Sequence, residues 1–132
     1  MTEDLVSVRY LVDDVAAAVE FYTQHLGFSE HFTALPAFAD VTRGRLRLLL
    51  SGPASSAGRA MPDGTRPSPG GWNRIHFVVD DLDTEITRLR EAGVRFRSDV
   101  VTGPGGRQIV FDDPAGNPVE LFQPAARPPR SR

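Results

Sequence analysis

The residues in this chain best suited to chemistry are one histidine, one glutamate and three arginines, all in predicted strands. His76 and Glu120 supply an imidazole and a carboxylate, which together can transfer a proton near neutral pH. Arg9, Arg47 and Arg74 supply guanidinium groups, whose planar N–H donors suit carboxylate, phosphate and polarised oxygen atoms. The set favours a site for a small anionic or oxygen-rich molecule, with His76 and Glu120 as candidate catalytic residues.

Composition and motifs argue against several other kinds of site. The chain of 132 residues has no cysteine, which excludes disulfides, thiolate metal ligands and a cysteine nucleophile. It has no nucleophile-elbow motif, and the glycine-rich stretch 103–106 lacks the lysine of a phosphate loop and is predicted to be a hairpin turn. The formal charge is −2 and the arginines are dispersed, so we expect no nucleic-acid partner. No apolar run is long enough to span a bilayer, so we expect no membrane contact and a cytoplasmic location.

Two similar halves must position these side chains. The sequence Val-Asp-Asp-Val at 12–15 returns as Val-Asp-Asp-Leu at 79–82, which predicts two copies of one unit. In each copy a β-rich stretch leads to an aspartate, Asp14 or Asp81, that can cap a helix with apolar residues at helical spacing. Each helix is followed by strand-like stretches, at about 28–36, 37–43 and 45–51 in the first copy and 94–102, 107–112 and 118–122 in the second. Each copy is therefore predicted to be a βαβββ module.

The modules occupy about 5–51 and 72–123 of a single domain that spans 1–132. Between them, residues 52–71 are rich in glycine and proline, which predicts either a flap over a site or a passive linker. The tail 124–132 is predicted to be frayed.

Three motifs resemble the vicinal oxygen chelate superfamily, which includes glyoxalase I, bleomycin resistance proteins, fosfomycin resistance enzymes and extradiol dioxygenases. They are Val12-Asp13-Asp14 with Phe21-Tyr22 and Leu26-Gly27-Phe28, Val79-Asp80-Asp81-Leu82, and Asp112-Asp113-Pro114-Ala115-Gly116-Asn117-Pro118-Val119-Glu120-Leu121. The resemblance implies an α+β fold, in which two βαβββ modules form an open, cup-like β-sheet with helices on the outside and a divalent metal on the concave face. It also implies a homodimer, with modules paired within a chain or between chains.

The positions that usually hold this metal carry different residues here. A histidine five residues before the valine of each Val-Asp-Asp motif is the usual ligand, and those places are Ser7 and Arg74. The last strand of each module usually supplies the other ligands, and there the chain has Leu49 and Glu120. A guanidinium repels a divalent cation, whereas metal sites gather imidazoles and carboxylates. We predict no metal and no other cofactor; the alternative is a displaced metal held by His76 and Glu120.

Strand alternation places several polar side chains on the inner face of the predicted cup. Trp72 is expected to stack on a ligand or to anchor the linker by burial, and Phe38, Phe111 and Phe122 to line an apolar pocket or to fill the core. The predicted ligand-binding residues are Ser7, Arg9, Arg47, Leu49, Trp72, Arg74, His76, Phe111, Glu120 and Phe122.

Three alternatives to a binding role stay open for the charged residues. Arg74 and Glu120 are alternatively a structural ion pair in a vacated metal site. Arg9 and Arg47 are alternatively at the rim of the cup or at a subunit interface. His76 is alternatively a hydrogen-bonded histidine without a catalytic role.

The function predicted from these features is that of a metal-independent protein that binds a small molecule. It would sequester an antibiotic or other secondary metabolite with anionic or oxygen-rich groups. The alternative is an enzyme, a lyase, isomerase or dioxygenase-like protein acting on a small oxygenated metabolite. That enzyme would be metal-free, with His76 and Glu120 transferring the proton, or would use a displaced metal.

Overall fold

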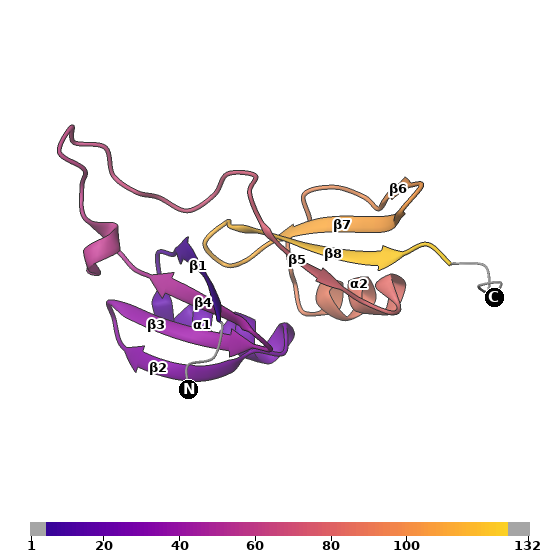
Figure 1. Ribbon diagram of the computed structural model, residues 1–132, viewed down its shortest axis with the longest axis horizontal. Coiled ribbons are helices and arrows are strands. Elements are labelled where there is room, and N and C mark those ends of the chain that lie inside the picture. The colour runs from indigo at the N-terminus through magenta and orange to yellow at the C-terminus, as the bar shows by residue number, and fades with distance from the viewer. Residues whose placement is uncertain (1–4, 127–132) are drawn as a thin grey trace. The chain divides into compact units, whose positions relative to one another are not determined.

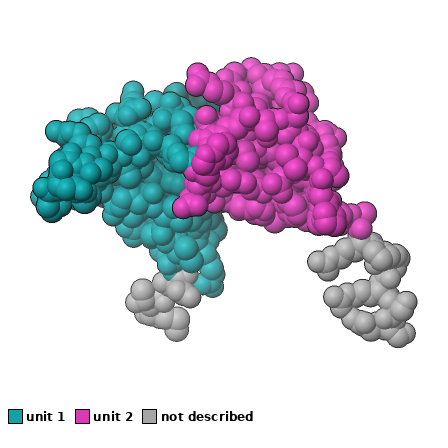
Figure 2. Space-filling model, turned by 90° about the horizontal axis from the view of Figure 1, so that it is seen from above, with its two compact units in different colours: residues 1–71, 113–117 teal, residues 72–112, 118–132 magenta. Residues whose placement is uncertain are grey.

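A computed structural model describes residues 5–126, which divide into two compact units, coloured separately in Figure 2. The first unit contains the chain up to Gly71 together with Asp113–Asn117. The second contains Trp72–Asp112 and the chain from Pro118 onward. No helix in the described residues is long and apolar enough to cross a membrane.

The first unit is a four-stranded sheet with one helix on one of its faces (Figure 1). Helix α1 contacts β2, β3 and β4, and the sheet order is β1-β4-β3-β2. Strand β1 pairs with β4 in parallel, and the other neighbours are antiparallel. The elements are β1 (Val6–Leu11), α1 (Val15–His25), β2 (Ser29–Ala34), β3 (Phe38–Arg43) and β4 (Leu46–Ser51).

The sequence explains where α1 begins and which face it buries. The carboxylate of Asp14 accepts a 3.1 Å hydrogen bond from the backbone N–H of Ala17 and so caps the first turn. The helix buries Val15, Ala18, Val19, Phe21 and Tyr22, and the fully buried side chains of the sheet include Val41, Leu48 and Leu50. The opposite side of this sheet, away from α1, is called the first open face.

The second unit repeats this arrangement with a four-stranded sheet of order β5-β8-β7-β6 (Figure 1). Asp81 caps α2, which buries Leu82, Ile86 and Leu89 and contacts β8. The side of the sheet away from α2 is called the second open face. The elements are β5 (Ile75–Val78), α2 (Leu82–Glu91), β6 (Val101–Gly103), β7 (Gly106–Asp112) and β8 (Pro118–Pro124).

Both halves have the element order βαβββ, so the predicted α+β class and module order are confirmed. The strand expected over 94–102 was wrong in extent, because regular pairing is limited to Val101–Gly103. Ahead of it, Phe96 makes only an isolated bridge to Phe111. The chain then bends over 97–99, where the hydroxyl of Ser98 donates to the carbonyl of Asp99. This bend breaks the ladder between the bridge and β6.

Residues 52–71 are attached to the first unit at both ends. Near its start, a short 3₁₀ helix (Ser56–Gly58) follows Ser55, whose buried hydroxyl donates to the carbonyl of Gly52 at 2.7 Å. Near its end, the N–H of Gly70 donates to the side-chain oxygen of Asn117 at 2.8 Å. Whether the middle of this loop serves as a flap stays a prediction.

Asp113, in the 113–117 segment of the first unit, is a buried carboxylate with several hydrogen-bond donors around it. One oxygen accepts from the backbone N–H groups of Ala115 and Asn117, and the other accepts from the Tyr22 hydroxyl and the Asn117 amide. Burial raises the pKa of Asp113, although these hydrogen bonds oppose the rise. Burial also raises the pKa of Tyr22, and the neighbouring Asp113 carboxylate adds to that effect. All four donors lie within the unit, so we interpret the cluster as structural.

Candidate functional site

The second open face brings together three of the predicted site residues. Strands β5 and β8 are parallel, and His76 pairs directly with Glu120. Arg74, one residue before β5, places its Nε 2.9 Å from Oε1 of Glu120, and its Nη1 donates to the carbonyl of Trp72. The side chain of Glu120 is only 10% exposed, so this guanidinium compensates an almost buried carboxylate.

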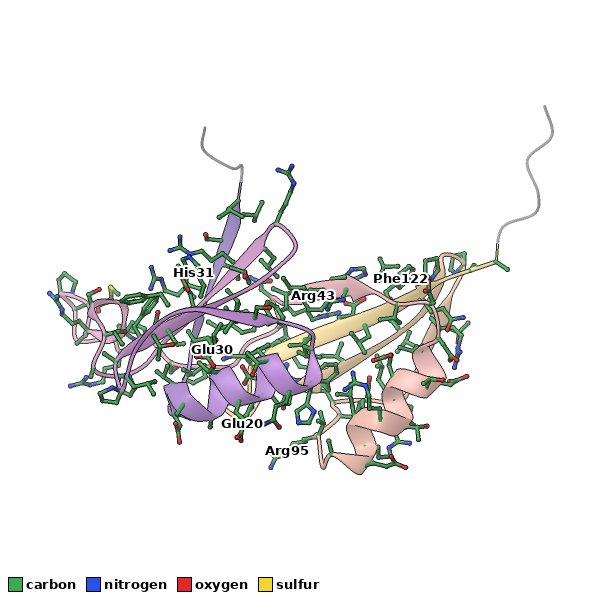
Figure 3. The ribbon with its side chains drawn as sticks, turned by 90° about the horizontal axis from the view of Figure 1, so that it is seen from below. Glu20, Glu30, His31, Arg43, Arg95 and Phe122 are labelled. Atoms are coloured by element: carbon green, nitrogen blue, oxygen red, sulfur yellow. The ribbon has the colours of Figure 1, made fainter. Side chains whose placement is uncertain are left out.

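His76 lies beside this pair but is not hydrogen-bonded to it. Its Nε2 is 3.6 Å from Oε2 of Glu120, which permits an ion pair when the imidazole is protonated but exceeds hydrogen-bond length. The imidazole also packs against the ring of Phe122, with 5.3 Å between centroids. Figure 3 shows Phe122 on the side of the sheet away from α2. The second open face therefore combines a cation, a carboxylate, an imidazole and an aromatic ring.

Trp72 and Phe111 take opposite positions in the second unit. Trp72 is 69% exposed, and the guanidinium of Arg97 lies 4.6 Å from its ring centroid, so the expected alternative of burial as an anchor was wrong. Phe111 is fully buried and packs edge-on against Phe96. Its side chain belongs to the core and is not part of the proposed site.

The first open face carries the remaining predicted residues. Ser7 is exposed opposite Arg47 in the parallel pairing, whereas Leu49 is buried. Arg9 donates from Nη1 to the hydroxyl of Ser51 at 2.7 Å. Arg47 also has a partner within the same sheet, because its Nε lies 3.0 Å from Oδ2 of Asp40.

His31 and Asp40 also lie on the first open face, and neither of them was predicted from the sequence as a site residue. Asp40 is 3% exposed and contacts both Arg47 and His31. Strand alternation could have indicated Asp40, because it lies between the apolar, buried Ala39 and Val41 and therefore points to the first open face. Alternation could not have indicated His31, because a β-bulge between Glu30 and Phe32 places its side chain on this face.

Two hollows of the second unit lie outside these faces. One of about 400 Å³ follows α2 between Asp83 and Glu91, and the other, of about 230 Å³, lies next to Gly106 and Gln123. Neither is lined by a predicted site residue.

Sequence comparison now decides the family. Residues 4–121 match the model of the Glyoxalase/Bleomycin resistance protein/Dioxygenase superfamily. The chain belongs to this superfamily. It is 31% identical over 146 residues to a 2-epi-5-epi-valiolone epimerase from Actinomyces sp, covering 92% of this chain and 80% of the epimerase.

Solved structures of superfamily proteins agree with the fold. Lactoylglutathione lyase from Agrobacterium tumefaciens is similar with a TM-score of 0.72 and 25% identity, covering 93% of this chain and 95% of the lyase. TnmS3, an antibiotic binding protein from Streptomyces sp. CB03234, is similar with a TM-score of 0.69 and 26% identity, covering 94% and 98%. The superfamily thus includes both enzymes and proteins that bind small molecules.

The residues present do not fit the divalent cation that the superfamily resemblance implies. Among residues 5–126, no three His, Cys, Asp or Glu side chains gather closely enough to hold a metal ion. At the expected positions, Ser7 is a weak ligand and Arg74 is a cation that already contacts Glu120. The described residues therefore do not offer that cation its usual set of ligands.

Proposed function

We propose that this protein binds a small molecule with anionic or polarised oxygen groups and that Arg74 provides the positive charge for it. The observation that carries this proposal is the 2.9 Å contact between Arg74 and Glu120. It puts a fixed guanidinium at a place where relatives are expected to hold a metal. Two of its five N–H donors serve Glu120 and Trp72, and the others remain to bind oxygen atoms of a ligand.

Sequestration of an antibiotic or other secondary metabolite is the role we propose for this binding. The similarity to the antibiotic binding protein TnmS3 supports it. The exposed ring of Trp72 and the half-buried ring of Phe122 offer apolar surface beside the charged groups, as a mixed aromatic and oxygen-rich ligand requires.

An enzyme acting on a small oxygenated metabolite is the second candidate. The similarity to an epimerase supports it, as does the 45% exposure of the His76 side chain next to Glu120. In that case His76 moves the proton and Arg74 orients the substrate. A homodimer and a cytoplasmic location stay predictions for either function.

A metal titration tests the absence of the usual cation. Purified, tag-free protein is heated with Mn²⁺, Ni²⁺ or Zn²⁺, and we expect no rise in Tm and no stoichiometric metal by elemental analysis. Arg74→His restores the usual ligand type and is expected to gain stabilisation by metal. Stoichiometric metal in the unaltered protein would overturn the proposal.

A ligand screen tests the binding role. Thermal shifts with carboxylated and phosphorylated metabolites and with aromatic antibiotics are followed by titration of each hit. Arg74→Gln removes the charge and is expected to weaken binding about tenfold or more, while Arg95→Gln, an exposed arginine of the same unit, leaves it unchanged. Mass spectrometry of the recovered ligand separates the two functions, because a binding protein returns it unaltered.

A further inference from the structure

The β-bulge in β2 positions an imidazole on the first open face. Glu30 pairs with Val41 and Phe32 pairs with Asp40, so His31 is the extra residue between them. Its Nδ1 lies 2.9 Å from Oδ1 of Asp40, within hydrogen-bond length. Figure 3 shows His31 on the side of the sheet away from α1.

Asp40 is held firmly enough to orient this imidazole. Its Oδ1 also accepts a 3.0 Å hydrogen bond from the backbone N–H of Phe32. Its Oδ2 lies 3.0 Å from Nε of Arg47, which compensates the charge although the N–H is not aligned for a hydrogen bond. With 3% of its surface exposed, the carboxylate has no freedom to turn toward solvent.

This contact fixes which nitrogen of His31 is basic. A carboxylate only accepts hydrogen bonds, so Nδ1 carries the hydrogen and Nε2 of the neutral ring carries the lone pair. Nε2 has no partner among residues 5–126, and the side chain is 60% exposed. A histidine whose one nitrogen donates to a buried carboxylate while the other faces solvent has the arrangement of a general base. His76 lacks it, because 3.6 Å separates its Nε2 from Glu120.

We propose that His31 is a catalytic residue for proton transfer and that Asp40 is its positioning residue. The rings of Phe32, which is 53% exposed, and Phe38 lie 6.3 Å apart on the same face and suit an aromatic substrate. Arg47 adds a half-exposed cation for oxygen atoms on which negative charge develops. The substrate class is therefore a small aromatic molecule with an acidic C–H or O–H and a polarised oxygen. This site goes beyond the proposed ligand binding, which rests on residues of the other unit.

A simple probe reports the step. In 5-nitrobenzisoxazole a base removes the ring C–H proton, the freed electron pair completes the nitrile, and the N–O bond breaks to leave a coloured phenolate. Nε2 of His31 takes the proton and then releases it to water, so no oxidant, reductant or second substrate is needed. The reaction is followed by absorbance.

The test compares the unaltered protein with three variants, His31→Ala, His25→Ala and His76→Ala. We expect the protein to exceed an equal concentration of free imidazole, and His31→Ala to lower kcat/KM about 100-fold, the range of a lost general base. His25→Ala removes a histidine at the end of α1 and is expected to keep the full rate. A rate no higher than free imidazole, full activity in His31→Ala, or a loss confined to His76→Ala would each overturn the proposal.

The positioning role of Asp40 has its own readout. The ¹⁵N shifts of His31 are expected to report hydrogen at Nδ1 in the neutral ring, and Asp40→Asn to redistribute it between the two nitrogens while lowering kcat/KM at least tenfold. Asp40→Glu is expected to restore part of both. Unchanged ¹⁵N shifts and rate in folded Asp40→Asn would remove Asp40 from the mechanism. The probe does not involve Arg74 or the ligand of the second open face, so this proposal and the binding function can fail separately.

Discussion

The hydroxyl of Tyr22 donates a 2.8 Å hydrogen bond to Oδ2 of Asp113, a residue 91 positions later in the chain. Tyr22 is fully buried and Asp113 is 4% exposed, so neither group can exchange this partner for water. An enclosed hydrogen bond to a carboxylate is among the stronger polar contacts in proteins. Both residues belong to the first unit, and its stability therefore depends on them.

Tyr22→Phe is expected to lower the free energy of unfolding by about 1.5–3 kcal/mol, the range for a hydrogen bond to a charged group. Urea unfolding measures the loss. In an Asp113→Asn background the same substitution is expected to cost less, because the acceptor no longer carries charge. Equal losses in the two backgrounds would show that the hydroxyl does not act through Asp113.

Asp113 also gives stability a pH dependence of unusual sign. Its pKa in the folded protein is raised above the ordinary 3.8, mainly by burial, so the folded state holds the proton more tightly than the unfolded chain. Its contribution to the free energy of unfolding is therefore greatest at low pH and falls as the pH rises from 3.8 through the raised value. Unfolding of the protein and of Asp113→Asn across this window measures it. As the pH rises, we expect the unaltered protein to lose stability relative to Asp113→Asn. A gain in stability relative to the variant would instead indicate a lowered pKa of Asp113.

Phe111 is expected to matter for stability alone. Phe111→Ala removes a fully buried ring and is expected to cost about 3–5 kcal/mol. Phe32→Ala removes a ring that is 53% exposed and is expected to change the free energy of unfolding by about 0.5 kcal/mol or less. Denaturant unfolding checks both. Similar costs at the two positions would contradict the assignment of Phe111 to the core.

The turn between β6 and β7 provides a matched pair of glycines. At Gly106, φ is +150° and an added Cβ would lie 2.2 Å from the carbonyl oxygen of Gln123, so Gly106→Ala forces the backbone to move. At Gly103 an added Cβ meets no atom within 4 Å. We expect Gly106→Ala to lower stability by about 1–3 kcal/mol, as for other strained backbone positions, and Gly103→Ala to have little effect on Tm. Equal Tm values for the two variants would refute this account.

Local signals in the sequence were sufficient for the order of the elements. Asp14 and Asp81 begin the two helices as predicted, because a capping side chain and a helical apolar stripe are both readable over a few residues. Alternation also placed Arg74, His76 and Glu120 on one face, because β5 and β8 are regular and in register. These predictions needed no knowledge of distant contacts.

The failures come from local irregularities. A bend over 97–99 ended the pairing expected over 94–102, although Ser98 and Asp99 within it are residue types typical of turns. The bulge at His31 reversed the alternation of β2, so the imidazole could not be assigned to a face. Phe111 was ambiguous because apolar residues suit both a core and a ligand site, and only its burial decides between them.

The register around the bulge has a consequence for how the first open face can change. Glu30 pairs with Val41 and Phe32 with Asp40, so the partners on β3 are consecutive and His31 has no partner position of its own. Deletion of His31 alone would make Glu30 and Phe32 consecutive, opposite Val41 and Asp40, and would leave the other pairs of β2 and β3 unchanged. The imidazole can therefore be gained or lost in one insertion or deletion, and relatives with the same architecture can differ by this one group.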